Sequence, residues 1–97
     1  MTFQDIGDGL RLHYHDLGRG EPLVFLHGSG PGASGWSNFK KNAPFFAEHG
    51  RRVILVDNLG FGQSSKPDVD YGMDFVVGGV KRLLDALGIE RCAVVGN

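Results

Sequence analysis

The chain has 97 residues, of which 41% are hydrophobic and 22% are charged, and its formal net charge is -1. This size allows at most one small domain, and the near-zero charge without a basic cluster excludes the electrostatic signature of nucleic-acid binding. The apolar runs are too short to cross a membrane, and we expect neither a membrane partner nor a secretory signal.

The first predicted element is an antiparallel hairpin. Residues 10–15 alternate apolar and polar side chains, which is the two-residue period of a half-buried strand, with Leu10, Leu12 and Tyr14 facing the core. The turn signal at residues 7–9 predicts that a short strand precedes it and pairs with it.

The same alternation places His13 and His15 on the other face of this strand. We interpret them as solvated side chains, because a metal-binding pair would need a third ligand and none is evident in the sequence.

Three continuous apolar runs follow, as expected for parallel strands that are covered on both faces: residues 23–26, 53–56 and, more weakly, 93–95. Strands that alternate with helical segments predict an α/β fold, in which the hairpin leads into a mostly parallel, doubly wound sheet.

Two helical segments fill the intervals between these strands. Residues 36–49 carry a helical pattern that Pro44 is expected to split, since proline is accommodated only in the first turn of a helix. A second helix is predicted around residues 76–87 from apolar side chains at 3.6-residue spacing, with Asp70 as its N-cap and Gly88 as its end.

The glycine-rich loop after the first buried strand has three interpretations. Gly28, Gly30 and Ala33 satisfy the dinucleotide pattern G-x-G-x-x-A, and Asp57 ends the next strand, but Pro31 removes an N–H from the stretch that would bind a pyrophosphate. An oxyanion loop would use the same glycines to turn backbone N–H groups toward developing charge. A flexible turn is the third interpretation.

Other polar side chains favour structural roles. Asp57 is interpreted as fixing a loop by hydrogen bonds, with a functional acid as the alternative. We expect His27 to be hydrogen-bonded beneath the glycine loop, His49 to lie near a helix C-terminus and Cys92 to be an inert core thiol. A single cysteine cannot form an internal disulfide, which favours a cytoplasmic location.

Two motifs carry a family resemblance. Residues 57–64 read D-x-x-G-x-G-x-S after the second buried strand, a pattern that resembles the α/β-hydrolase superfamily. Residues 26–39, LHGSGPGASGWSNF, are similar to the meta-cleavage product hydrolases, which cut carbon–carbon bonds in 2-hydroxy-6-oxo-dienoates formed from ring-opened aromatics. The resemblance extends over essentially all of the chain.

The resemblance implies that residues 1–97 are the N-terminal part of one α/β-hydrolase core domain that ends after its fifth strand, with the lid and the C-terminal half outside it. In such enzymes the nucleophilic serine occupies a G-x-S-x-G turn. Gly96 and Asn97 match the first two positions, so the nucleophile is expected immediately after Asn97, and no member of the triad can be assigned within the chain. The expected partners are the C-terminal remainder of the enzyme, a dienoate substrate and further copies in a homo-oligomer. No metal or organic cofactor is implied.

The resemblance also implies roles for a few residues. Ser29 matches the loop position whose N–H helps to form the oxyanion hole, with Gly28 and Gly30 beside it, and its hydroxyl could contact the substrate. Asn38 and Asn97 match polar positions near the dienoate end of the substrate. On the sequence alone, a helix-start asparagine and a turn residue remain the alternatives for these two positions.

The predicted function is therefore that of the N-terminal segment of a serine-dependent carbon–carbon bond hydrolase. Within the same fold, the alternatives are an esterase, an epoxide hydrolase or a haloalkane dehalogenase. A non-catalytic fragment that serves in folding or assembly, and a dinucleotide-binding unit, are alternatives from other classes.

Overall fold

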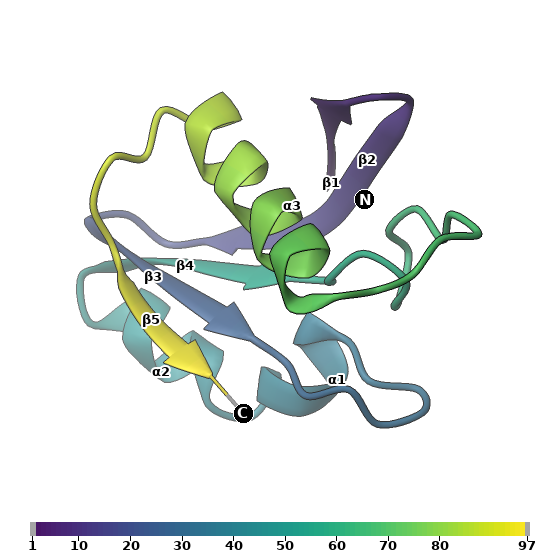
Figure 1. The fold of residues 1–97 in the computed structure, drawn as a ribbon. Coiled ribbons are helices and arrows are strands. Elements are labelled where there is room, and N and C mark those ends of the chain that lie inside the picture. Colours follow the sequence, from purple (N-terminus) through teal and green to yellow (C-terminus); the bar gives the residue numbers. More distant parts are fainter. Residues whose placement is uncertain (1, 97) are drawn as a thin grey trace.

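The computed structural model describes residues 2–96, which form one five-stranded sheet in the order β1-β2-β4-β3-β5 with helices on both faces (Figure 1). The elements in chain order are β1 (Thr2–Gly7), β2 (Leu10–Leu17), β3 (Glu21–Leu26), α1 (Gly35–Phe39), α2 (Ala43–Glu48), β4 (Arg51–Val56), α3 (Met73–Ala86) and β5 (Ala93–Gly96). The predicted α/β class, the strands and their order along the chain are confirmed.

The hairpin of β1 and β2 joins the sheet in the antiparallel direction. Its turn consists of Asp8 and Gly9, whose φ angles of 57° and 73° are both positive, as a tight hairpin turn between twisted strands requires. β2 then pairs antiparallel with β4, whereas β3 pairs in parallel with β4 on one side and with β5 on the other. The sheet is therefore mixed, with its parallel part formed by β3, β4 and β5.

Two hydrophobic clusters cover the two faces of the sheet. On one face, α3 packs Val80 and Leu83 against Leu12, Val24 and Ile54. On the other face, α1 and α2 cover β3 and β4. Phe39 of α1 and Ala43 of α2 pack there against Leu23, Phe25, Val53 and Leu55. Since neighbouring residues of β3 and β4 enter different clusters, their continuous apolar runs are explained.

The helices agree with the sequence except at one cap. The segment from 36 to 49 is split as predicted, and Pro44 lies in the first turn of α2. The predicted N-cap at Asp70 is wrong: α3 begins after Gly72, which has extended backbone angles and no side chain with which to cap the helix. Asp70 is exposed and lies two residues too early. Gly88, with a φ of +72°, ends the helix region as predicted.

β5 differs from the two other parallel strands. All four of its residues are exposed, so the prediction that the run over 93–95 is a buried strand is wrong. Its backbone nevertheless pairs in parallel with β3, and Val94 remains 56% exposed. The half-buried Cys92 lies just before it, against the cluster under α3, in agreement with the expected core thiol.

Within residues 2–96, none of the helices is both long and apolar enough to cross a membrane.

Candidate active site

Two loops meet where the parallel strands β3 and β4 end, which we call the carboxyl edge of the sheet. The first follows β3 and covers residues 27–34, and the second follows β4 and covers residues 57–66. β3 and β4 are parallel, with Leu26 opposite Val56, so both loops leave the sheet at the same level. In an open α/β sheet, this carboxyl edge is where ligands bind.

The first loop is exposed in its middle and anchored at its ends. Ser29 and Gly30 are exposed, and Ala33 donates a backbone hydrogen bond to the Gly30 carbonyl at 3.0 Å. At its far end, the Ser34 hydroxyl accepts the Ser37 N–H at 3.0 Å and the Ser37 hydroxyl accepts the Ser34 N–H at 2.9 Å, which is a reciprocal N-terminal cap of α1. Sequence reasoning missed this cap, although the S-x-x-S spacing signals it.

Gly35, the first residue of α1, packs directly against β4. A Cβ atom at this position would lie 2.9 Å from the Leu55 carbonyl carbon and from the Val56 oxygen. Only glycine permits this approach of helix to strand, and the approach brings the end of the first loop next to the start of the second.

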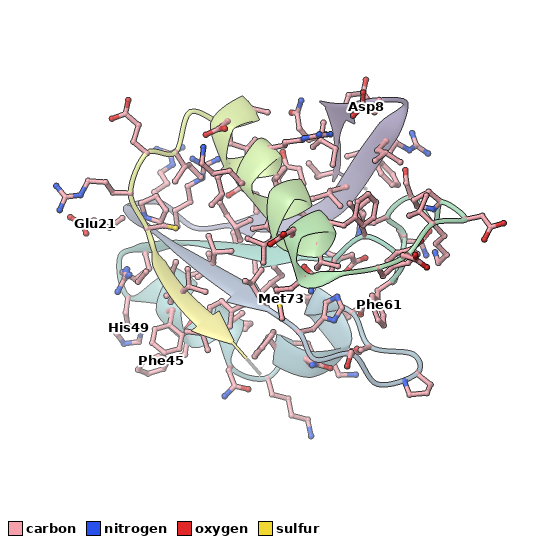
Figure 2. The ribbon with its side chains drawn as sticks, viewed as in Figure 1. Asp8, Glu21, Phe45, His49, Phe61 and Met73 are labelled. Atoms are coloured by element: carbon pink, nitrogen blue, oxygen red, sulfur yellow. The ribbon has the colours of Figure 1, made fainter. Side chains whose placement is uncertain are left out.

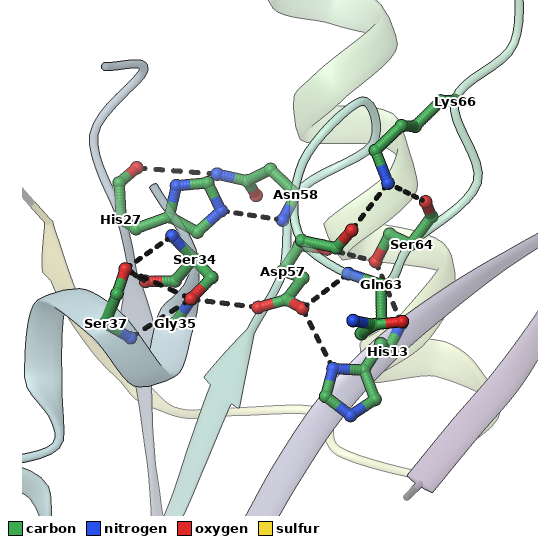
Figure 3. A network of polar contacts seen from close by, with 11 residues as sticks. His13, His27, Ser34, Gly35, Ser37, Asp57, Asn58, Gln63, Ser64 and Lys66 are labelled. Carbon is green, nitrogen blue, oxygen red and sulfur yellow. Dashed lines mark hydrogen bonds and ion pairs between the residues drawn. The ribbon is translucent and has the colours of Figure 1, made fainter. Parts of the chain in front are cut away.

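His27 anchors the start of the first loop. Its side chain is buried, its Nδ1 lies 2.6 Å from the Gly28 carbonyl oxygen, and its Nε2 accepts the backbone N–H of Asn58 at 3.0 Å. The ring also packs edge-to-face on Phe61. The predicted hydrogen-bonded position beneath the glycine loop is confirmed, and the bond to Asn58 ties the first loop to the second (Figure 3).

Asp57 joins the polar groups at the carboxyl edge through its carboxylate. Its carboxylate accepts the Gly35 N–H at 2.9 Å, the Gln63 N–H at 3.0 Å and a hydrogen bond from His13 Nδ1 at 2.9 Å (Figure 3). Burial raises the pKa of this carboxyl, but the hydrogen bonds from Gln63, His13 and Gly35 outweigh burial and hold the pKa below its usual value. Asp57 therefore fixes both loops, as the loop-fixing interpretation predicted, and its bonded carboxylate gives no support to a ribose-binding acid.

Ser64 completes the second loop. Its buried hydroxyl donates to the Asp57 carbonyl at 2.6 Å and accepts the His13 backbone N–H at 2.9 Å. Lys66 Nζ caps the Gly62 carbonyl on the outer side of the same loop. The second loop is thus closed on itself and bound to β2.

The prediction that His13 is solvated is wrong. It is 4% exposed, because the second loop and α1 cover this face of β2. Its Nδ1 pairs with Asp57, which offsets part of the cost of burial, whereas its Nε2 is buried without a hydrogen-bond partner among residues 2–96. His13 and His15 do share one face, with ring centroids 5.0 Å apart, and His15 also contacts the Trp36 ring at 5.0 Å. Burial, with the charge of His13 second, lowers the pKa of His15.

No group of three or more histidine, cysteine or acidic side chains within residues 2–96 is arranged to hold a metal ion.

The fourth histidine, His49, lies where the sequence placed it. His49 is the C-cap of α2, where its Nδ1 lies 2.6 Å from the Phe45 carbonyl oxygen.

The residues assigned to the oxyanion hole and to the substrate border two grooves. One is lined by Gly28, Ser29 and apolar side chains of α3 such as Met73 and Val76. The other lies across the loop and is lined by Gly28, Gly30 and the half-buried Asn38. Asn97, the remaining predicted substrate residue, lies outside the described residues.

Gly28 is therefore shared by both grooves. Phe61 and Met73, the first residue of α3, also line the first groove, and both are labelled in Figure 2. Within residues 2–96, the Ser29 N–H has no hydrogen-bond acceptor. A backbone donor in this state can stabilise an anion that forms beside it.

Comparison with known proteins gives one family and a consistent set of relatives. Residues 21–97 match the model of the family described as alpha/beta hydrolase fold. A 2-hydroxy-6-oxononadienedioate/2-hydroxy-6-oxononatrienedioate hydrolase of Paraburkholderia phymatum is 54% identical over 94% of this chain and 32% of its own length. A 2-hydroxy-6-oxo-6-phenylhexa-2,4-dienoate hydrolase of Comamonas testosteroni is 47% identical over 100% of this chain and 34% of its own length.

The similar solved structures share the fold but differ in activity, and one of them is again a meta-cleavage product hydrolase. A meta-cleavage product hydrolase from Pseudomonas fluorescens IP01 is 39% identical and superimposes with a TM-score of 0.86, covering 92% of this chain and 33% of that one. The chain thus spans about a third of the length of the curated relatives that it matches.

Proposed function

Because the chain belongs to the alpha/beta hydrolase fold family, we propose that it supplies the N-terminal part of a serine hydrolase that cleaves a carbon–carbon bond in 2-hydroxy-6-oxo-2,4-dienoates. The observation that carries this proposal is the identity of 54% and 47%, over nearly the whole chain, to relatives named as hydrolases of such dienoates. The matched region includes both loops of the carboxyl edge.

In the proposed reaction, the dienol substrate first isomerises to its keto form. A serine hydroxyl or an activated water then adds to the C6 carbonyl, whose oxygen takes up the negative charge. The carbonyl re-forms as the adjacent carbon–carbon bond breaks, and the electron pair of that bond is delocalised into the departing keto acid, which takes up the proton lost by the attacking hydroxyl. Where serine attacks, water then hydrolyses the acyl ester that remains. The chain's part in this sequence is to stabilise the C6 oxyanion.

The proposed oxyanion hole uses the Ser29 N–H, with Gly28 and Gly30 allowing the close approach of the substrate. Support comes from the exposure of Ser29 and Gly30 and from the Ser29 N–H, which donates to no backbone acceptor within residues 2–96. We propose that the Ser29 hydroxyl, Asn38 and Asn97 contact the dienoate. For Asn38, the support is that it lines a groove together with Gly28.

The proposal is tested with the open reading frame that contains these residues. The purified product is expected to consume a 2-hydroxy-6-oxo-dienoate faster than it hydrolyses simple esters, epoxides or haloalkanes. The reaction is monitored by the loss of the dienolate absorbance. In this assay Ser29→Ala removes the hydroxyl but keeps the backbone N–H, so we expect kcat to fall by only about tenfold. Asn38→Ala is expected mainly to raise KM. A protein that turns over esters, epoxides or haloalkanes but no dienoate contradicts the proposal.

We further propose a cytoplasmic enzyme that needs the C-terminal remainder of the domain for activity and assembles into a homo-oligomer. The location is supported by the single free Cys92, which suits a reducing compartment. The homo-oligomer stays a prediction from the family resemblance, and the elution volume of the purified product on a sizing column tests it.

A further inference from the structure

The hydrogen bonds of His27 determine where its proton lies. Nε2 faces the backbone N–H of Asn58, which can only donate, so Nε2 must present a lone pair. Nδ1 faces the Gly28 carbonyl, which can only accept, so Nδ1 must carry the hydrogen. Both partners are main-chain groups with fixed roles, so the ring is held as the neutral Nδ1–H tautomer.

This tautomer controls the peptide plane between Gly28 and Ser29. The carbonyl of Gly28 and the N–H of Ser29 belong to one trans peptide and point in opposite directions. When the His27 ring holds the Gly28 oxygen at 2.6 Å, the Ser29 N–H is directed away from the ring. Without this bond, a glycine-rich stretch would allow the peptide to rotate at little cost.

We infer that His27 is a positioning residue that, through the Gly28 carbonyl, aims the Ser29 N–H at the reaction oxyanion, and that Asn58 sets the tautomer needed for this. The inference rests on the proposed function and adds a residue to its machinery. His27 borders the first groove, but in this scheme it acts on the substrate only through the Gly28–Ser29 peptide. Its contribution is the orientation of one peptide, held from the second loop.

The test uses two substitutions that each retain one half of the ring's hydrogen bonding. His27→Asn places an amide nitrogen near the position of Nδ1 and keeps the donor to Gly28. His27→Gln reaches the position of Nε2, keeps an acceptor for Asn58 and loses the donor to Gly28. Both leave a polar group of similar size in the buried site, so a role in packing alone would affect them alike.

The expected result is a split between the two variants. In the open reading frame product, His27→Asn retains kcat within about fivefold, whereas His27→Gln loses about 100-fold in kcat with KM changed by less than about threefold, since the Ser29 N–H acts only on the transition state. The control is His49→Gln, a histidine beside Phe45 on α2 (Figure 2), which also bonds a carbonyl through Nδ1 and is expected to leave turnover unchanged.

Each variant is assayed with a dienoate and with a p-nitrophenyl ester, because both reactions pass through an oxyanion. If the ester is turned over and the dienoate is not, the proposed function fails, while the kcat split on the ester still decides the inference. Equal kcat values for His27→Asn and His27→Gln overturn the inference.

A second measurement needs no variant. Two-bond ¹H–¹⁵N correlation of the wild-type protein is expected to show the His27 proton on Nδ1. A proton on Nε2 overturns the inference, whatever the kinetics of variants that fold poorly.

Discussion

The two loops at the carboxyl edge of the sheet are built in opposite ways. The loop after β4 is closed by buried side chains, since Asp57 and Ser64 bond backbone groups on both of its flanks. The loop after β3 is exposed in its middle, with a backbone hydrogen bond between Gly30 and Ala33, and is held at its ends by His27, Gly35 and the Ser34–Ser37 cap. The difference supports a division of work in which one loop supplies rigidity and the other, under the proposed function, keeps N–H groups for a ligand.

The substitution with the largest expected effect on stability is Asp57→Ala. The substitution leaves buried His13 and the N–H groups of Gly35 and Gln63 without their common acceptor. We expect the free energy of unfolding, measured with urea, to fall by about 3–5 kcal/mol. The exposed Asp68→Ala is the control and is expected to change it by less than about 0.5 kcal/mol. A loss below about 1 kcal/mol at Asp57 would show that the second loop is not the rigid one.

A pair of glycine substitutions sharpens the contrast. At Gly62, with a φ of +53°, a Cβ atom would lie 2.2 Å from the Asp57 carboxylate, so Gly62→Ala is expected to lower the free energy of unfolding by about 2 kcal/mol or more. At Gly30 a Cβ atom meets nothing within 4 Å, and Gly30→Ala is expected to change stability by less than about 0.5 kcal/mol. Its effect is expected on kcat instead. Equal thermal shifts for the two variants would contradict the division of work.

The smallest expected effect is a pH dependence. The pKa of Asp57 is lower in the folded chain than in the unfolded chain, so the unfolded state takes up its proton first as the pH falls. The stabilisation from Asp57 is complete above about pH 5 and is lost as the pH falls through the folded pKa. Urea unfolding between pH 6 and 3 should show a steeper loss in the wild type than in Asp57→Asn, and parallel curves would count against the carboxylate as the common acceptor.

Much of this edge could be predicted from the sequence because its signals are local. The apolar runs of β3 and β4, the glycines between His27 and Trp36, and Asp57 at a strand end indicated the two loops and a loop-fixing acid. His27 was expected beneath the first loop because it directly precedes the glycines.

What the sequence did not reveal depends on residues far apart in the chain. The burial of His13 requires a partner 44 residues away, and the two-residue period of β2 contains no sign of the loop that covers its second face. The choice of Gly72 over Asp70 as the N-cap follows from how the chain enters α3. β5 is apolar like β3, but its place at the sheet edge is set by the whole topology.

The strand order of the sheet also affects how the chain folds while it is being synthesised. β3 must leave one edge open for β5, whose first residue is 37 positions beyond the end of β4. At a synthesis rate of about 5–20 residues per second, that gap takes about 2–7 s, whereas a hairpin such as that of β1 and β2 forms in microseconds. The flank of Leu23–Leu26 that pairs with β5 therefore stays unpaired for seconds of synthesis, after the hairpin has already formed.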